Sequence, residues 1–268
     1  MPLIIGMGMG LGFGGQVSPR PWTPAELGAD LALWLDAEDT ASITLNGSNV
    51  SQWNDKSGNN RHVSQGAAAS QPAYSATGFN GKPTIQHDGI NDFLSANTAA
   101  QAIGSQAFTL LGAIRFPTSI SLGGYIISLR EGGGQSTTRG YMFHGSNTFS
   151  SAWGNPFTSA PSMPVAEGTN NILGVQRRTG GVAESFVNGV AGGSITANFP
   201  SPFGQMSLGS LVQQGFTDSW FSEVVISTGT MTTTDRQKLE GYLAHKWGLE
   251  DDLPVDHPFK STPPTVTP

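Results

Sequence analysis

The 268-residue sequence contains no cysteine. This absence excludes a disulfide framework, a cysteine-based metal site and a thiol nucleophile. Charge is also scarce, because charged residues make up 12% of the chain, against about 25% in an average globular protein. Lysine and arginine stand singly apart from Arg177–Arg178, and the net charge is −6. The chain therefore lacks the basic footprint of a protein that binds nucleic acid or anionic lipid, and neither is expected as a partner.

Long apolar runs are missing as well. No segment approaches the ~20 consecutive apolar residues of a membrane-spanning helix, so no membrane partner is expected. A secretory leader would need a basic start followed by an apolar core, whereas the first charged residue is Arg20 and glycine fills much of the stretch before it. We therefore expect no cleaved leader.

Turn-forming residues are abundant, with 36 glycines and 17 prolines. Short apolar runs alternate with clusters of Gly, Asn and Asp, which is typical of a β-sandwich or β-barrel. The Asn188–Gly189 pair predicts a two-residue hairpin turn of type I′, because that turn needs positive φ at both central residues. The sequence thus predicts an all-β fold. The segments that contain its strands are 31–40, 50–65, 81–96, 107–116, 125–130, 141–145, 171–178, 183–190, 205–210 and 219–227.

One helix is expected, over residues 232–249. Thr234 and Gln237 have the spacing of a capping box at its start, and Gly248 supplies a stop signal at its end. Apolar residues recur on one face, so the helix should pack on a sheet. These residues are Leu239, Tyr242, Leu243 and Trp247.

We divide the chain into three parts. Residues 1–27 form a glycine-rich arm with a proline-rich linker, and residues 28–250 form the sandwich. Residues 251–268 form a proline-rich tail, which should run extended over the surface with neither helix nor strand.

The arm contains the ribbon GMGMGLGFGG, residues 6–15, with glycine at every second position. In an extended ribbon the apolar side chains of Met7, Met9, Leu11 and Phe13 point to one side, and the glycines leave the other side flat. We predict that these four residues anchor the protein in an assembly by pairing with another copy or another protein. The alternatives are a floppy terminus and a glycine-zipper helix.

One ordered set of motifs runs through the chain: LWLDAED (33–39), VSQWNDKSGNNRH (50–62), HDGINDFL (87–94), AESFVNGV (183–190), SEVVIST (222–228) and LEGYLAHKWGLEDDLPVDHPFK (239–260). In this order they resemble the laminin G-like branch of the concanavalin A-like lectin/glucanase family, in the variant found in bacteriophage and prophage structural proteins. The resemblance covers residues 28–262. His87 departs from it, because the family usually places Phe before the Asp-Gly turn.

The resemblance implies a two-sheet antiparallel jelly-roll sandwich with one C-terminal helix and extended terminal arms. It also implies a non-enzymatic bacteriophage virion protein, of the decoration, head-fibre or tail-associated kind, assembled in the host cytoplasm. Its partners would be other virion proteins of the capsid or tail, further copies of itself such as a trimer, and a cell-surface glycan. A carbohydrate-binding or host-adhesion module is the alternative function, and a glycoside hydrolase the third.

The hydrolase alternative requires paired carboxylates, which glucanases of this fold place on alternate residues of one strand. Asp36 and Glu38 have that spacing, with Trp34 on the same side. They lie in a turn-like Asp-Ala-Glu-Asp cluster, however, and the family's Glu-x-Asp-x-x-Glu motif is absent. No catalytic residue is therefore expected. Glu223 matches a structural position of the family pattern, where an acid caps or pairs locally.

Calcium is the one cofactor that the resemblance suggests, because relatives hold it at a sandwich rim with Asp, Asn and backbone oxygens. The candidate ligands are Asp36, Asp39, Asp55, Asp88 and Asp92, with Asn54 and Asn91 beside them. The alternative is that these residues form Asx turns and bind their own backbone.

Sugar recognition needs an exposed aromatic platform with neighbouring amides. The polar segment 145–164 offers Phe149, Trp153, Asn155 and Phe157, which are the candidate glycan-binding residues. The alternative is that these aromatic side chains are buried against a neighbouring subunit.

Overall fold

The computed structural model describes residues 18–96, 107–118, 124–130, 139–145, 147–154, 158–196, 205–211, 215–229 and 231–266. The four residues of the expected anchor lie outside this range, and so do Asn155, Phe157 and the side chain of Trp153.

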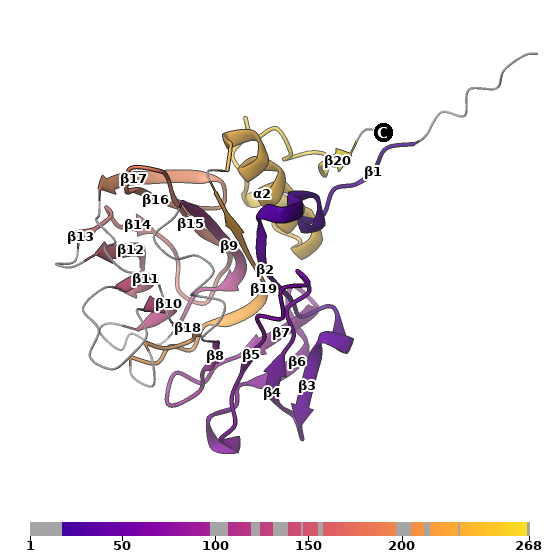
Figure 1. Cartoon of the computed structure of the whole chain (residues 1–268), viewed down its shortest axis with the longest axis vertical. Helices are drawn as coiled ribbons and strands as arrows, with labels where there is room; N and C mark the ends of the chain where they lie inside the picture. Colours follow the sequence, from indigo (N-terminus) through magenta and orange to yellow (C-terminus); the bar gives the residue numbers. More distant parts are fainter. Residues whose placement is uncertain are drawn as a thin grey trace, which may run out of the picture.

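Two antiparallel sheets make up the sandwich (Figure 1). The first has the order β17–β16–β15–β9–β19–β2. Its strands are β2 (Leu31–Asp36), β9 (Phe108–Arg115), β15 (Asn170–Arg177), β16 (Val182–Val187), β17 (Val190–Thr196) and β19 (Trp220–Thr228).

The second sheet has the order β12–β11–β10–β18–β8–β5–β4–β3, with β13 and β14 paired to β12. Its strands are β3 (Ile43–Asn46), β4 (Asn49–Trp53), β5 (Val63–Ser64), β8 (Leu94–Ala96), β10 (Tyr125–Arg130), β11 (Arg139–Gly145), β12 (Thr148–Gly154), β13 (Thr158–Ser159), β14 (Met163–Pro164) and β18 (Gln205–Leu208). The hairpin of β6 (Ala73–Phe79) and β7 (Lys82–Gln86) links β4 to β19. The predicted all-β, antiparallel two-sheet fold is confirmed.

Side chains on the two faces of β9 serve two different cores. Leu110 and Ile114 point between the sheets, into the main core. Leu111 and Ala113 point to the opposite face, into a second core beneath the C-terminal helix. Because successive side chains of a strand alternate between its faces, a strand covered on both sides must be apolar on both. All of β9 except its last residue is accordingly buried.

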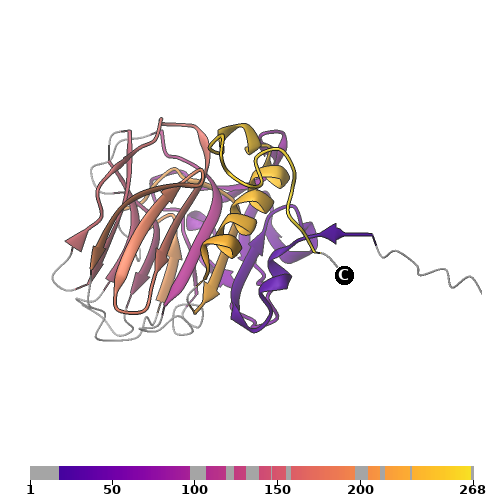
Figure 2. The same ribbon diagram turned by 90° about the horizontal axis from the view of Figure 1, so that it is seen from above.

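The helix α2 (Thr233–Trp247) lies across the outer face of the first sheet (Figure 2). Leu239, Leu243 and Trp247 are completely buried there, which confirms the predicted packing face. Gly248 ends the helix in the left-handed conformation, also as predicted. The predicted capping box was placed wrongly, however.

The N-cap is Thr232, whose hydroxyl accepts a hydrogen bond from the backbone N–H of Asp235 and donates one to its carboxylate. The Thr234–Gln237 spacing is therefore not used. Three threonines stand in a row at residues 232–234, and only the tertiary packing of the apolar face selects which of them begins the helix. The Asn188–Gly189 turn is confirmed, with φ of 49° and 79° between β16 and β17.

The described parts of both flanking segments, residues 18–27 and 251–266, pack on the sandwich. Trp22 and the short helix η1 (Pro24–Asp30) cover one edge of α2's core, and β1 (Arg20–Pro21) pairs with β20 (Thr265–Val266). The expectation that the tail holds neither helix nor strand is wrong, because it contains η4 (Glu250–Asp252) and β20. The remaining short helices are η2 (Thr40–Ser42) and η3 (Ala68–Ser70). Within the described part of the chain, no helix is both long and apolar enough to span a bilayer.

Candidate functional site

The expected glycan platform is not formed by Phe149. Its side chain is 0% exposed and belongs to the core between the sheets. The sequence analysis treated 145–164 as a loop, whereas most of it forms β12, β13 and β14. Strand alternation turns Phe149 inward.

The calcium candidates are dispersed, and each already has donors within the chain. Asp55 accepts hydrogen bonds from the backbone N–H groups of Trp34, Ser57 and Arg61. Asp39 lies 3.1 Å from the ammonium of Lys56. Among the described residues, no three His, Asp or Glu side chains are arranged to hold a metal ion.

Asp88 and Asp92 form the turn before β8. Asp88 Oδ1 accepts from the backbone N–H groups of Ile90, Asn91 and Asp92, and Asp92 Oδ2 accepts from the backbone N–H of Asp88. These two residues therefore bind their own backbone in an Asx turn, which was the alternative to calcium binding. Burial and the neighbouring Asp88 raise the pKa of Asp92 to about 6. The structure therefore does not bring the five carboxylates together as one ligand set.

The paired acids Asp36 and Glu38 are placed differently from the expected turn. Asp36 is the last residue of β2 and is buried, on the same face as Trp34, beneath α2. Its direct cross-strand partner on β19 is Glu223. Lys246 of α2 bridges the two carboxylates, at 2.8 Å from Asp36 Oδ1 and 2.9 Å from Glu223 Oε2.

Glu223 is completely buried and receives four donors. Its Oε1 accepts from Trp34 Nε1 (2.6 Å) and from the Tyr242 hydroxyl (2.9 Å). Its Oε2 accepts from Trp247 Nε1 (2.7 Å) and lies against Lys246. The local pairing that the family pattern implied for this acid is therefore present, and it holds α2 on the sheet.

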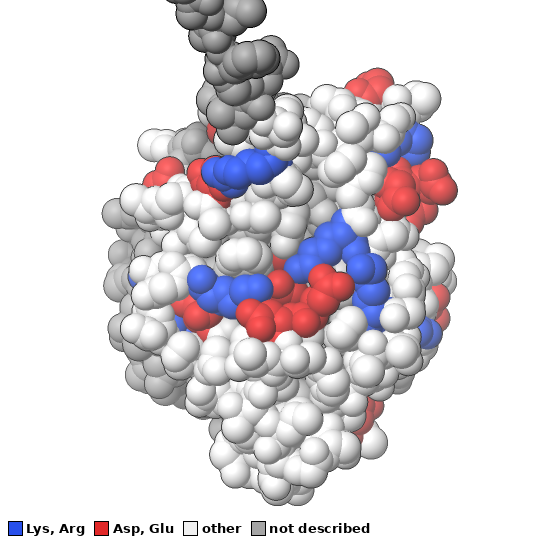
Figure 3. Space-filling model, turned by 90° about the vertical axis from the view of Figure 1, so that its right-hand side faces the viewer, with Lys and Arg blue, Asp and Glu red and all other residues white. Residues whose placement is uncertain are grey.

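Two further lysines lie beside Asp36 and Glu38. Lys56 lies 2.8 Å from Asp36 Oδ2, and Lys82 lies 3.3 Å from Glu38. Figure 3 shows acidic groups between basic ones in a band across one face of the molecule. We call Asp36, Lys56, Glu223 and Lys246 the buried charge cluster.

The pKa values of the two acids in the buried charge cluster are shifted in opposite directions. Burial raises the pKa of the Glu223 carboxyl, although the Lys246 ammonium opposes that rise. Burial also acts to raise the pKa of Asp36, but the ammonium groups of Lys246 and Lys56 outweigh it and hold that pKa below the usual range. Neither carboxylate is open to a substrate, so the arrangement does not resemble a hydrolase centre with two accessible acids.

A different set of residues forms an aromatic pocket, of about 200 Å³, which we call the Phe93–Phe216 pocket. The two phenyl rings lie 6.4 Å apart between centroids and are tilted by 39°. The pocket combines the β5–η3 connection, the turn before β8 and the segment before β19. Its lining residues are Gln65, Ala67, Ser70, Asn91, Phe93 and Phe216.

Polar groups surround the two rings. The side chains of Ser70 and Asn91 make no hydrogen bond to another described residue, while the Gln65 amide is held by the backbone N–H of Ala67. The backbone N–H of Phe93 bonds the carbonyl of Ser70 at 3.2 Å, which fixes the floor of the pocket. Of the described residues that line it, none is charged. The sequence analysis missed the pocket because its two aromatic residues lie far apart in the chain.

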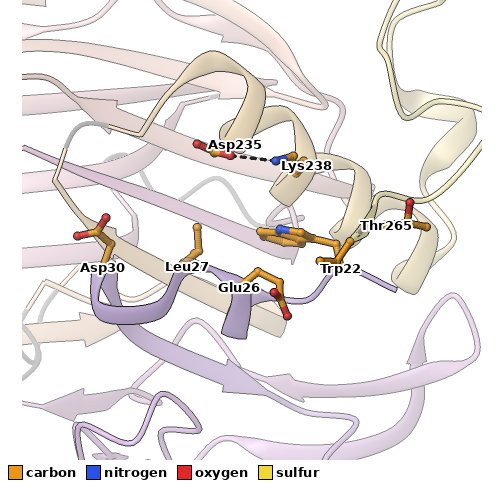
Figure 4. Close-up of a pocket in the computed structure, with 8 residues that line it drawn as sticks. Trp22, Glu26, Leu27, Asp30, Asp235, Lys238 and Thr265 are labelled. Carbon is orange, nitrogen blue, oxygen red and sulfur yellow. Dashed lines mark hydrogen bonds and ion pairs between the residues drawn. The ribbon is translucent and has the colours of Figure 1, made fainter. Parts of the chain in front are cut away.

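Two other cavities are less suited to a ligand. One, of about 410 Å³, lies where the two ends of the described chain meet (Figure 4), but three of its four charged lining residues are already in ion pairs, Glu26 with Arg20 and Asp235 with Lys238. The other, of about 480 Å³, is lined by asparagines that mostly bond one another or the backbone, as Asn80 does to the carbonyl of Trp247.

Comparison with known proteins identifies the fold. No family model and no curated protein matches the sequence. The receptor-binding domain of botulinum neurotoxin type G has a TM-score of 0.56 and 13% identity, over 81% of this chain and 52% of that one. Trypanosoma rangeli sialidase, solved in complex with sialic acid, has a TM-score of 0.58 and 13% identity, over 86% and 36%.

The binding domain of Paraclostridial Mosquitocidal Protein 1 is similar too, with a TM-score of 0.57 and 9% identity over 80% of this chain and 52% of that one. The chain thus spans about half the length of these structures or less. Similarity at such low identity concerns the fold alone. By its architecture, the chain is a two-sheet antiparallel β-sandwich.

Proposed function

We propose that this chain is a non-enzymatic, lectin-like module that binds a neutral glycan in the Phe93–Phe216 pocket. The observation that carries the proposal is the combination of two partly exposed phenyl rings with the free polar side chains of Ser70 and Asn91. A sugar ring stacks its C–H face on an aromatic ring, and its hydroxyls need amide and hydroxyl partners.

The uncharged lining of the pocket favours neutral sugars over anionic ones. An anionic sugar would need a cation to balance its carboxylate, and the described lining residues include none. The volume of about 200 Å³ suits one monosaccharide unit, the rest of the glycan extending into solvent.

Two further observations support a binding module. Structures with the same fold include receptor-binding domains and a sialidase in complex with sialic acid, which are proteins that engage receptors or sugars. In Figure 1, β1 and β20 lie at one end of the molecule and the ends of β5 and β8 near the other. A tether at the chain ends would therefore leave the pocket facing outward.

The proposal includes the absence of catalysis. Asp36 and Glu223 are buried and fully engaged by lysine, indole and hydroxyl donors, so this carboxylate pair does not serve acid–base chemistry on a glycan. In the finer form of the proposal, the module is displayed on a bacteriophage virion and joins other virion proteins and copies of itself through its N-terminal ribbon. The virion assignment in that form rests on the family resemblance, and the role of the ribbon rests on its alternation of glycine with apolar residues.

A glycan array probed with the full chain tests the proposal. We expect binding to neutral glycans, with affinity reduced at least tenfold in Phe216→Ala and in Asn91→Ala. The matched control is Trp220→Ala, which removes a partly exposed aromatic side chain outside the pocket. Absence of binding by the wild type, binding unchanged in Phe216→Ala, or release of reducing sugar would each contradict the proposal.

A further inference from the structure

The buried charge cluster brings a primary amine against a carboxyl group from a distant part of the chain. Lys246 Nζ of α2 lies 2.8 Å from Asp36 Oδ1 of β2, and the Lys246 and Asp36 side chains are only 14% and 6% exposed. A second carboxylate, Glu223 on β19, lies 2.9 Å from the same nitrogen and is 0% exposed. An amine, an electrophilic carbonyl carbon and a proton acceptor are therefore in contact.

Aromatic side chains enclose this contact. Lys246 Nζ lies 5.1 Å from the Trp247 ring centroid and 5.5 Å from that of Tyr242. Such a site contains little water, which removes the large excess of water that normally drives amide bonds toward hydrolysis. Held groups also react as if at very high concentration, with effective molarities of about 10⁵–10⁸ M in well-oriented pairs.

We propose that Lys246 and Asp36 join in an intramolecular amide bond, with Glu223 transferring the proton. The Lys246 ammonium gives one proton to Glu223, which passes it to Asp36 Oδ1, and the neutral Nζ then attacks Cγ of the neutral Asp36 carboxyl group to form the C–N bond. The Cγ–Oδ1 bond breaks. Oδ1, which already carries the proton passed on by Glu223, takes a second proton from the nitrogen and leaves as water. Ammonium plus carboxylate thus become amide plus water, with no oxidant or other reactant.

Each neighbour of the reacting atoms has a role in this step. Burial favours the protonated form of Glu223 that the proton transfer requires. Lys56 Nζ lies 2.8 Å from Asp36 Oδ2, the oxygen that carries negative charge after the attack, and is placed to stabilise it. Trp34 and Trp247 hold Glu223 in position through their indole N–H groups.

The bond would have a mechanical consequence. The chain enters the sandwich through β2 and leaves it through α2, and its two described ends lie side by side at β1 and β20. A covalent link from Asp36 to Lys246 would carry any force applied between these ends and bypass the sheets between them. The inference is independent of the glycan pocket, which lies elsewhere.

Mass spectrometry of the full-length wild-type protein, unfolded before injection, tests the proposal. We expect a mass lower by one water molecule than the sequence mass, and a proteolytic fragment in which the segments around residues 36 and 246 are joined. Lys246→Arg, which keeps the charge but replaces the amine, should show its full sequence mass. Asp36→Asn should lose ammonia in place of water.

The outcomes are distinguishable. A wild-type mass equal to the sequence mass, in folded protein incubated for days, overturns the bond without bearing on glycan binding. Loss of water that maps to another segment overturns it equally. Glu223→Gln should lack the cross-link or form it far more slowly, and a cross-link that forms in that variant at the wild-type rate overturns the role of Glu223.

Discussion

Asp36 and Glu223 stand directly opposite each other on neighbouring strands, two buried carboxylates whose shared counter-ion is Lys246. Like charges in such a cross-strand pair destabilise a sheet unless they are compensated. Removing the compensating ammonium should therefore be costly.

The first prediction is that Lys246→Met destabilises the fold by about 3–5 kcal/mol, because without this amine neither the ion pairs nor the proposed amide can form, and the buried carboxyl groups of Asp36 and Glu223 lose their partner. Urea denaturation measures the change. The control is Lys238→Met on the same helix, where the partly exposed pair with Asp235 should change the free energy of unfolding by about 0.5 kcal/mol or less. Equal effects of the two substitutions would contradict the compensating role of Lys246.

Truncation of Trp247 tests how α2 is held on the first sheet. Its side chain is completely buried, packs edge-on against Phe79 and donates to Glu223. Trp247→Ala should cost about 3–5 kcal/mol, as expected for truncating a large buried aromatic side chain. A melting temperature close to that of the wild type would show that the helix is not held through this residue.

His87 should make the protein sensitive to acid. The imidazole is buried against Phe221 and Gly209, neither ring nitrogen is hydrogen-bonded, and burial lowers its pKa to about 3. Below the ordinary pKa of histidine, about 6.5, His87 binds a proton in the unfolded chain but not in the folded chain. The free energy of unfolding therefore falls as the pH falls below about 6.5.

We expect His87→Phe to remove this loss. Between pH 7 and pH 5 the wild type should lose about 2 kcal/mol more than the variant. Asp92 acts in the opposite direction in both proteins. Its pKa is raised to about 6, so it increases the free energy of unfolding as the pH falls through 6. The comparison of their pH profiles therefore isolates His87. Parallel profiles would show that the imidazole is not held neutral.

The N-terminal ribbon can be tested independently of the sandwich. Leu11→Asp combined with Phe13→Asp replaces half of the predicted anchor with charge. We expect a variant that remains folded, with a nearly unchanged melting temperature, but fails to join the assembly that the wild type forms, as measured by light scattering. Normal assembly of the variant, or a large fall in its melting temperature, would contradict the anchor.

Local signals in the sequence predicted much of the architecture. The Asn188–Gly189 turn, the Gly248 stop and the apolar face with Leu239, Leu243 and Trp247 depend on residues close together in the chain, so they could be read without a structure. The number and spacing of apolar runs predicted an all-β sandwich or barrel for the same reason, and the family resemblance implied the two antiparallel sheets. Phe149 was wrongly predicted to be part of an exposed platform, because its burial depends on the opposite sheet that covers its strand.

The candidate sites were decided by tertiary structure. Phe93 and Phe216, or Asp36, Glu223 and Lys246, come together only through strand register and the docking of α2. Asp36 looked like a turn residue because it lies in the Asp-Ala-Glu-Asp cluster and acids are rarely buried without a partner. One of its two lysine partners, Lys246, is more than two hundred residues away in the chain. The sequence by itself thus determined the periodicity that forms strands and helix, since that is a short-range property. Which polar side chains share a buried site follows from long-range pairing, and only the folded chain specifies it.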